Sequence, residues 1–159
     1  MSQTNELEIM ERIALDLEGV EESLASSFNT GAEDFNALIR PLSAAGGKRL
    51  RAQLCLLIAN AGTSVERQRI RIAEAVEMLH LATLIHDDVL DQAEIRRGEE
   101  TIHMHKGNKV AILSGDYLFA KAFQIVSEMP NMKYLQIFSH IITCLVEGEF
   151  MQMEDVYRI

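Results

Sequence analysis

Apolar residues recur every three or four positions along most of this chain, which is the spacing of one face of an α-helix. The first such stripe consists of Leu7, Met10, Ile13 and Leu17. Glycines, the segment NTGAEDF and Pro130 interrupt the pattern and divide it into successive segments. The pattern predicts helices over residues 3–27, 33–44, 48–60, 64–91, 109–129 and 131–157.

The connections between these segments are short, which favours an all-α, antiparallel helical array. No stretch alternates convincingly between apolar and polar residues, so no β-strand is expected, and no internal repeat is found. The segment RRGEETIHMHKGN is expected to be irregular or only briefly helical. Thr63 and Glu66 fit a capping box at the start of the longest helix of this half. The length of 159 residues suits one domain.

Composition narrows the class of protein. The chain is 48% hydrophobic and 25% charged, which is typical of a globular protein. A net charge of −9 opposes unspecific nucleic-acid binding. The longest uninterrupted apolar run, residues 54–59, is too short to cross a bilayer, and the acidic N-terminus does not resemble a signal peptide. We therefore expect no transmembrane segment and a cytoplasmic location. Cys55 and Cys144 are expected to be buried free thiols.

Three aspartates and two arginines gather in the stretch HLATLIHDDVLDQAEIRRG. Asp87 and Asp91 are four positions apart, so both project from one face of the predicted helix. That face continues back through Leu84 and Thr83 to His80. Like charges one turn apart repel each other, and these lie near a helix C-terminus, where negative charge is unfavourable.

This arrangement of carboxylates requires a counter-charge, and two interpretations are open. One is Mg²⁺, which takes oxygen ligands from one or two carboxylates and keeps its other positions for water and phosphate. The other is a solvated helix end whose acidic groups pair with Arg96, Arg97 or Lys106. The apolar turn LATLI before the carboxylates favours the first, because it indicates a helix that faces an interior cavity.

Basic residues occur on both sides of the acidic cluster. Lys48 and Arg51 stand three apart at a helix start beside two glycines, where cations and free N–H groups suit a phosphate; a solvated basic patch is an equal alternative. Arg96 and Arg97 follow the carboxylates. His80 alone would be interpreted as a hydrogen-bonded core histidine, but it shares the face of the carboxylates. These groups together suit two anionic ligands, one bound by cations and one bridged through Mg²⁺.

At this point the residues resemble a known family, the trans-isoprenyl diphosphate synthases or polyprenyl synthetases. The motifs GGKRLR, EMLHLATLIHDDVLDQAEIRRG, GNKVAILSGDYLFAKAF and GEFMQ occur in the family's order and spacing, from about residue 38 onward. The chain looks most like the long-chain branch, such as heptaprenyl and octaprenyl diphosphate synthases. The resemblance implies the all-α isoprenoid synthase fold around a deep apolar cavity. It also implies a prenyltransferase that condenses an allylic diphosphate head-to-tail with isopentenyl diphosphate.

The resemblance also implies roles for individual residues. Asp87 and Asp91, helped by Asp88, would hold Mg²⁺ against the allylic diphosphate and so promote its departure. Arg96 would contact the allylic diphosphate. Isopentenyl diphosphate would be held by Lys48, Arg51, His80 and Arg97.

Product length is set in this family by the residues four and five before the first aspartate. These are Thr83 and Ala82, both small, so a growing chain is expected to pass them and extend beyond farnesyl. Glu100 and Ala52 stand where the family usually has proline, and neither is a predicted ligand group.

The chain is about half as long as the family's enzymes, so residues 1–159 are expected to be the N-terminal portion of a polyprenyl synthetase domain that continues further. The second aspartate-rich motif of the family has no counterpart in the sequence, which puts the activity of this chain alone in question. The alternative function is a non-catalytic diphosphate-binding or regulatory subunit, and a helical interaction module is a third. Because a half-fold exposes apolar faces, we expect a homodimer or a partner subunit.

Overall fold

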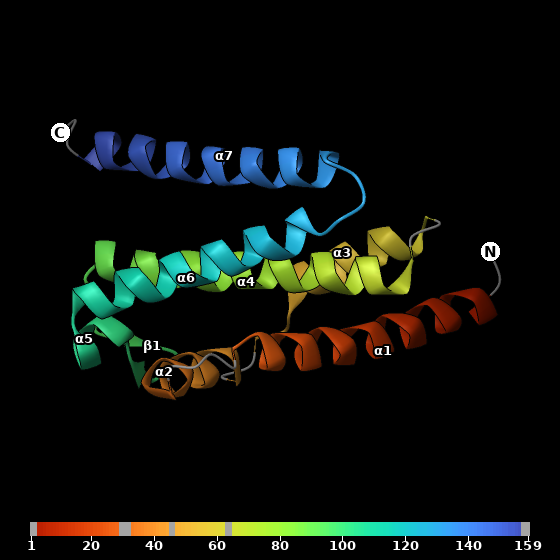
Figure 1. The fold of residues 1–159 in the computed structure, drawn as a ribbon, viewed down its shortest axis with the longest axis horizontal. Coiled ribbons are helices and arrows are strands. Elements are labelled where there is room, and N and C mark those ends of the chain that lie inside the picture. Colours follow the sequence, from red (N-terminus) through yellow and green to blue (C-terminus); the bar gives the residue numbers. More distant parts are fainter. Residues whose placement is uncertain (1–2, 29–32, 45–46, 63–64, 157–159) are drawn as a thin grey trace.

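The computed structural model describes residues 3–28, 33–44, 47–62 and 65–156 of the chain. Figure 1 shows that the long helices run with nearly aligned axes and are joined by shorter elements. In chain order the elements are α1 (Gln3–Ser27), α2 (Glu33–Ala44), α3 (Leu50–Asn60), α4 (Glu66–Leu90), β1 (Ile95–Arg96), β2 (Glu99–Glu100), α5 (Ile102–Lys106), α6 (Asn108–Ser127) and α7 (Lys133–Val156).

The predicted helices are confirmed, with ends that differ by at most two residues from the expected ones. The predicted capping box does not start α4, which begins at Glu66 with Val65 as its N-cap and no side-chain cap hydrogen bond. Thr63 itself lies outside the described residues.

The expectation that the chain contains no strand is wrong at one place. β1 and β2 pair antiparallel, with Ile95 opposite Glu100 and Arg96 opposite Glu99. The turn between them is Arg97–Gly98, with φ of 54° and 87°. Positive φ at both central residues is what a type I′ hairpin turn requires. Strands of two residues are too short to produce a readable alternation, which is why the sequence pattern missed them.

The core is built around α4, which packs against α1, α3 and α6. Small buried side chains in both α4 and α6, including Ala82 and Ala111, let the two helices approach closely. Gly115 of α6 lies directly against the ring of His86, so no side chain fits between them. This packing fixes the rotation of α4 and therefore decides which of its side chains reach a cavity.

Buried carboxylates tie α1 to α4. Asp16 accepts a hydrogen bond from Nε of Arg69 at 2.6 Å. Glu74 is fully buried and accepts hydrogen bonds from the hydroxyls of Ser23 and Ser27, each at 2.7 Å. Since a buried charge is costly unless paired, these contacts fix the register between the two helices. The N-terminal part of α1 is looser, because Leu7 of its predicted apolar stripe is exposed.

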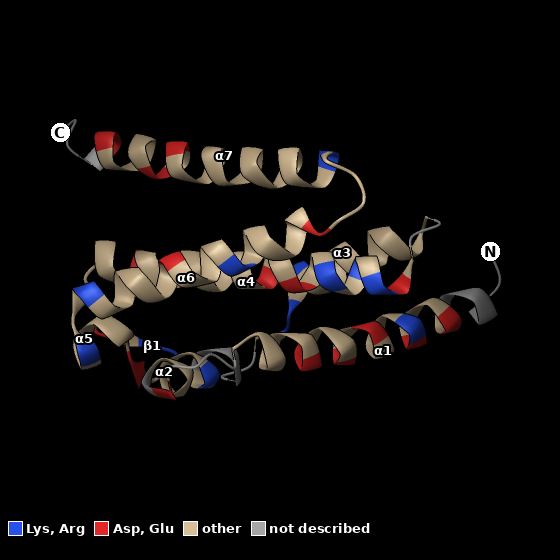
Figure 2. Cartoon of the chain, in the orientation of Figure 1, with Lys and Arg blue, Asp and Glu red and all other residues tan. Residues whose placement is uncertain are grey.

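α7 stands apart from the core, as Figure 1 shows. It is joined to α6 near its start, where the rings of Phe123 and Phe138 meet edge to face at 5.5 Å. Further along, its apolar side chains are exposed, and Figure 2 shows few charged residues on it before its C-terminal end. Cys144 lies on this helix and is exposed, which corrects the expectation of a buried thiol, whereas Cys55 is half-buried; both are free.

One helix among the described residues, α6, is long and apolar enough to cross a membrane by length and composition. It packs along α4 with Leu118, Ala122 and Ile125 buried. The core helix of a globular protein passes the same test, so this is weak evidence for a membrane span.

Candidate functional site

Three cavities surround the C-terminal half of α4, and Leu84 contributes to the wall of each. One is small and basic, one is large and apolar, and one lies against the hairpin. The residues predicted from the sequence are distributed over these three cavities. Their chemistry therefore depends on which side of α4 each side chain occupies.

The small cavity, about 150 Å³, collects basic side chains from distant parts of the chain. Its wall includes Lys48, Arg51, His80 and Arg97, which are the four residues predicted to hold isopentenyl diphosphate. The guanidinium of Arg97 lies close to Gly47. A Cβ added at residue 47 would be 3.3 Å from Nη2 of Arg97. Arg97 has a positive φ in the hairpin turn, and it lines both this cavity and the one against the hairpin.

The surroundings of His80 in this basic cavity favour its neutral form. Burial lowers its pKa, and the adjacent charges of Arg51 and Arg97 lower it further. Nη1 of Arg51 lies 3.1 Å from Nε2 of His80. Since a guanidinium only donates, Nε2 is the acceptor and the imidazole proton resides on Nδ1. An anion that enters the cavity would therefore favour protonation of His80.

The three predicted aspartates lie in different surroundings. Burial raises the pKa of Asp87, and the negative charges of Glu149 and Asp91 raise it further. Glu149 belongs to α7, so a carboxylate from a second helix faces the cluster across the apolar cavity. Asp91 is the C-cap of α4 and is exposed. Within the part of the chain that the structure describes, no three His, Cys, Asp or Glu side chains form a complete metal site.

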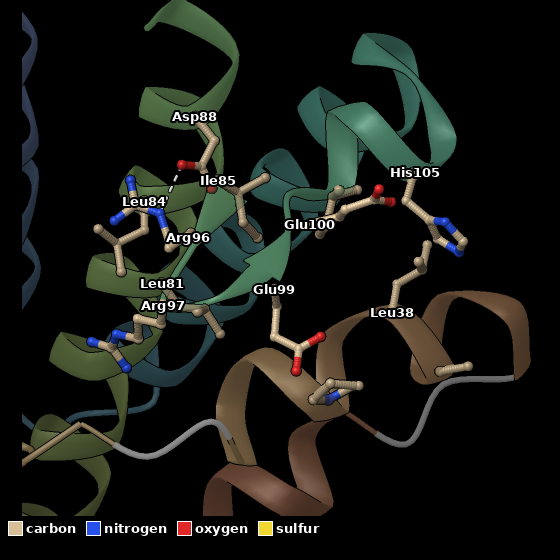
Figure 3. A pocket seen from close by; sticks show the side chains of 13 residues that line it. Leu38, Leu81, Leu84, Ile85, Asp88, Arg96, Arg97, Glu99, Glu100 and His105 are labelled. Carbon is tan, nitrogen blue, oxygen red and sulfur yellow. Dashed lines mark hydrogen bonds and ion pairs between the residues drawn. The ribbon is translucent and has the colours of Figure 1, made fainter. Parts of the chain in front are cut away.

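Asp88 points to a different side of α4 from its neighbour Asp87. It is buried and accepts a hydrogen bond from Nε of Arg96 at 2.7 Å. Figure 3 shows this pair in the wall of the third cavity, which Arg97 also lines. This cavity of about 500 Å³ lies between α2, α4 and the hairpin, with Leu38 among its apolar lining. Arg96 is thus held by a carboxylate rather than directed at Asp87.

The large apolar cavity, about 550 Å³, lies between α4, α6 and α7. Its lining includes the carboxylates Asp87 and Glu149, and it shares Arg51 and His80 with the basic cavity. Much of its apolar wall comes from Phe119 and a row of α7 side chains. Thr83, one of the two residues predicted to control product length, lines this cavity. Ala82 is fully buried in the core and is not part of the cavity wall.

Sequence reasoning gave no role to several charged residues of these cavities, among them Glu149, Arg49 and Glu77. Glu149 falls within the motif GEFMQ, but nothing in the sequence indicated that it faces Asp87. Arg49 and Glu77 line the basic cavity, and both lie within quoted motifs without having been assigned a role. In the sequence, only their place within the motifs pointed to these residues. The packing of the helices shows which cavity each one lines.

A comparison with protein-family models matches residues 32–158 to "Polyprenyl synthetase". The chain belongs to the polyprenyl synthetase family. It is 33% identical over 148 residues to the octaprenyl diphosphate synthase of Escherichia coli (strain K12), a match that covers 93% of this chain and 46% of the relative. It is 38% identical over 144 residues to heptaprenyl diphosphate synthase component 2 of Geobacillus stearothermophilus, covering 90% and 45%.

Solved structures of polyprenyl synthetases agree with the fold. The heptaprenyl diphosphate synthase of Staphylococcus aureus superposes with a TM-score of 0.85 at 29% identity, covering 90% of this chain and 46% of that one. The polyprenyl synthase of Caulobacter crescentus CB15, complexed with calcium and isoprenyl diphosphate, gives 0.84 at 36% identity, covering 90% and 45%. The predicted isoprenoid synthase fold is confirmed, and the chain spans about half the length of these relatives.

Proposed function

We propose that this chain forms the diphosphate-binding half of a trans-prenyltransferase, which joins isopentenyl diphosphate head-to-tail to an allylic diphosphate. The observation that carries the proposal is the order of features along α4. A basic cavity lies beside His80, Thr83 lines an apolar cavity, and carboxylates stand at Asp87. This order suits two diphosphate groups bound side by side, with room in the apolar cavity for the hydrocarbon tail of one substrate.

Isopentenyl diphosphate would occupy the basic cavity. Lys48, Arg51 and Arg97 supply fixed positive charge, and His80 adds a further cation when the ligand's charge favours its protonation. Cations that converge from a helix start, a helix face and a hairpin turn fix both phosphates in one orientation. Holding the substrate in place is itself a large part of the rate of a two-substrate reaction.

The allylic diphosphate would lie at Asp87 and Asp91. Two carboxylates fit Mg²⁺, which takes one or two protein carboxylates together with water and phosphate oxygens. The negative charge concentrated around Asp87 fits the same need for a cation. When bound, Mg²⁺ stabilises negative charge on the departing diphosphate. The relative from Caulobacter crescentus, described as complexed with calcium and isoprenyl diphosphate, supports a divalent cation in this role.

Arg96, which is hydrogen-bonded to Asp88, would contact the allylic diphosphate. In the reaction the allylic C–O bond breaks and its electron pair leaves on the diphosphate. The double bond of isopentenyl diphosphate then attacks the allylic cation, and a proton is lost. The apolar wall that includes Phe119 excludes water from the cation, which water would otherwise capture.

The growing chain would enter the apolar cavity past Thr83. Its volume and the small side chain at this position support products longer than farnesyl. Residues 1–159 would then be the N-terminal portion of the polyprenyl synthetase domain. A second copy of the chain or a partner subunit would cover the exposed apolar side chains of α7. The cytoplasm is the proposed location, and no nucleic acid is expected as a partner.

The direct test mixes the chain with Mg²⁺, isopentenyl diphosphate and farnesyl diphosphate, and analyses extracted products by chromatography. Elongated prenyl diphosphates support the prenyltransferase, and Thr83→Phe is expected to shorten them. If no product forms but pyrophosphate binds in a Mg²⁺-dependent manner, the alternative of a non-catalytic diphosphate-binding subunit stands instead. Asp87→Ala is expected to remove that Mg²⁺ dependence. Unchanged binding in this variant would contradict the metal assignment.

A further inference from the structure

A buried carboxylate lies in the wall of the basic cavity, where an anion is proposed to bind. Glu77 is on α4, one turn before His80, and its side chain is only 6% exposed. Negative charge at this place opposes anion binding electrostatically. The contacts of Glu77 must therefore make a structural contribution that outweighs this electrostatic cost.

The contacts of Glu77 converge on the start of α3. One carboxylate oxygen accepts a hydrogen bond from the backbone N–H of Ala52 at 2.9 Å. The other lies 3.6 Å from Nη1 of Arg49. α3 has no side-chain cap of its own. Glu77 therefore does for this helix what an N-cap residue usually does, but from a neighbouring helix.

Arg49 is fixed in an unusual backbone conformation between the two predicted diphosphate ligands Lys48 and Arg51. It has φ of 47° and ψ of 38°, the left-handed region that side chains other than glycine rarely adopt. Its guanidinium makes two hydrogen bonds with Glu21 of α1, at 2.6 and 3.0 Å. These bonds, together with Glu77, raise the pKa of Arg49. Arg49 thus anchors the segment rather than serving as a ligand group.

We propose that Glu77 is a positioning residue for the basic cavity: by holding the N–H of Ala52 and the guanidinium of Arg49, it orients Lys48 and Arg51 toward a diphosphate. The inference rests on the proposed function, because it assumes that the basic cavity takes a diphosphate. Glu77 contributes geometry at an electrostatic cost. Positioning and simple charge effects therefore predict changes of opposite sign when its charge is removed.

The experiment titrates the full chain with inorganic pyrophosphate by isothermal titration calorimetry, in a chelator and without metal, so that only the basic cavity is measured. The Glu77→Gln substitution keeps the shape of the side chain but leaves a single acceptor oxygen. The glutamine therefore cannot contact both the N–H of Ala52 and the guanidinium of Arg49 through oxygen atoms. We expect pyrophosphate to bind about tenfold more weakly to this variant, the size associated with a lost charged hydrogen bond. Equal or tighter binding, as charge removal alone predicts, overturns the proposal.

Glu74→Gln is the matched control, since it removes a buried carboxylate from the same helix one turn earlier, outside the basic cavity. Its pyrophosphate affinity is expected to stay within about twofold of the unaltered chain. An equal loss in both variants would indicate general loosening of α4 and overturn the proposal. Circular dichroism establishes whether each variant is folded.

A second variant keeps the test decisive if Glu77→Gln does not fold. Glu21→Gln changes a largely exposed carboxylate and releases the other side of Arg49. We expect about threefold weaker pyrophosphate binding, although a negative charge has been removed, and unchanged or tighter binding overturns the proposal. If the unaltered chain binds no pyrophosphate, the diphosphate site of the proposed function fails, and the role of Glu77 fails with it. Binding to the unaltered chain with no loss in the variants refutes only the inference.

Discussion

The pair formed by Asp88 and Arg96 allows a quantitative test of how the aspartate cluster is divided. The side chain of Asp88 is 8% exposed and that of Arg96 is 32% exposed. The pair lies between a surface ion pair, worth up to about 1 kcal/mol, and a buried one, whose disruption costs roughly 3–5 kcal/mol. Asp88→Asn should therefore lower the free energy of unfolding by about 2 kcal/mol. For a chain of this size, that corresponds to a fall of roughly 4–8 °C in the unfolding temperature.

A double-mutant cycle isolates the contribution of the pair. The variants are Asp88→Asn, Arg96→Gln and the combination, each unfolded in urea and followed by circular dichroism. We expect a coupling energy of about 1–2 kcal/mol, because the second substitution removes a partner that the first has already left unpaired. Effects that add within about 0.3 kcal/mol would refute the energetic importance of this contact.

Mg²⁺ binding provides the functional half of the test, with Asp87→Asn as the matched control. Because Asp88 is bonded to Arg96, its replacement should leave the Mg²⁺ concentration for half-maximal pyrophosphate binding within about twofold. Asp87→Asn should raise that concentration about tenfold or more. An equal rise in both variants would show that Asp88 is a metal ligand and that our division of the cluster is wrong.

Three further outcomes are expected. The pKa of Asp87 is raised in the folded chain, so the Asp87→Asn variant should unfold at a higher temperature than the unaltered chain at pH 7 without metal. Thermal scans should show this difference shrinking as the pH falls toward about 4, where the carboxyl group of the unfolded chain takes up its proton. The pKa of His80 is lowered, so the stability that it contributes is present above about 6.5 and lost as the pH falls; calorimetry should also show proton uptake on pyrophosphate binding, which His80→Gln reduces. Gly115→Ala should destabilise the chain by roughly 1–3 kcal/mol in urea titrations, because the new methyl group displaces His86; an unchanged midpoint would mean that the ring moves away freely.

The sequence by itself determined the helices and the family. Apolar periodicity, glycines and Pro130 defined the helix ends within two residues, because helix boundaries depend on local signals that each segment carries. The hairpin was missed because it depends on two turn residues and on pairing rather than on a repeating pattern. The motifs also singled out Lys48, Arg51, His80 and Arg97, which line one cavity in the structure.

Only the tertiary structure decided which side chains share a cavity. Asp87 and Asp88 are neighbours in the sequence, yet consecutive helical residues point about 100° apart, so one faces α7 and the other bonds to the hairpin. Ala82 and Thr83 separate in the same way, into the core and into the cavity wall. Glu149 faces the carboxylate cluster only because α7 forms a wall of the apolar cavity that α4 and α6 also line. A sequence records the order of charges along a helix, whereas their partners depend on packing between helices far apart in the chain.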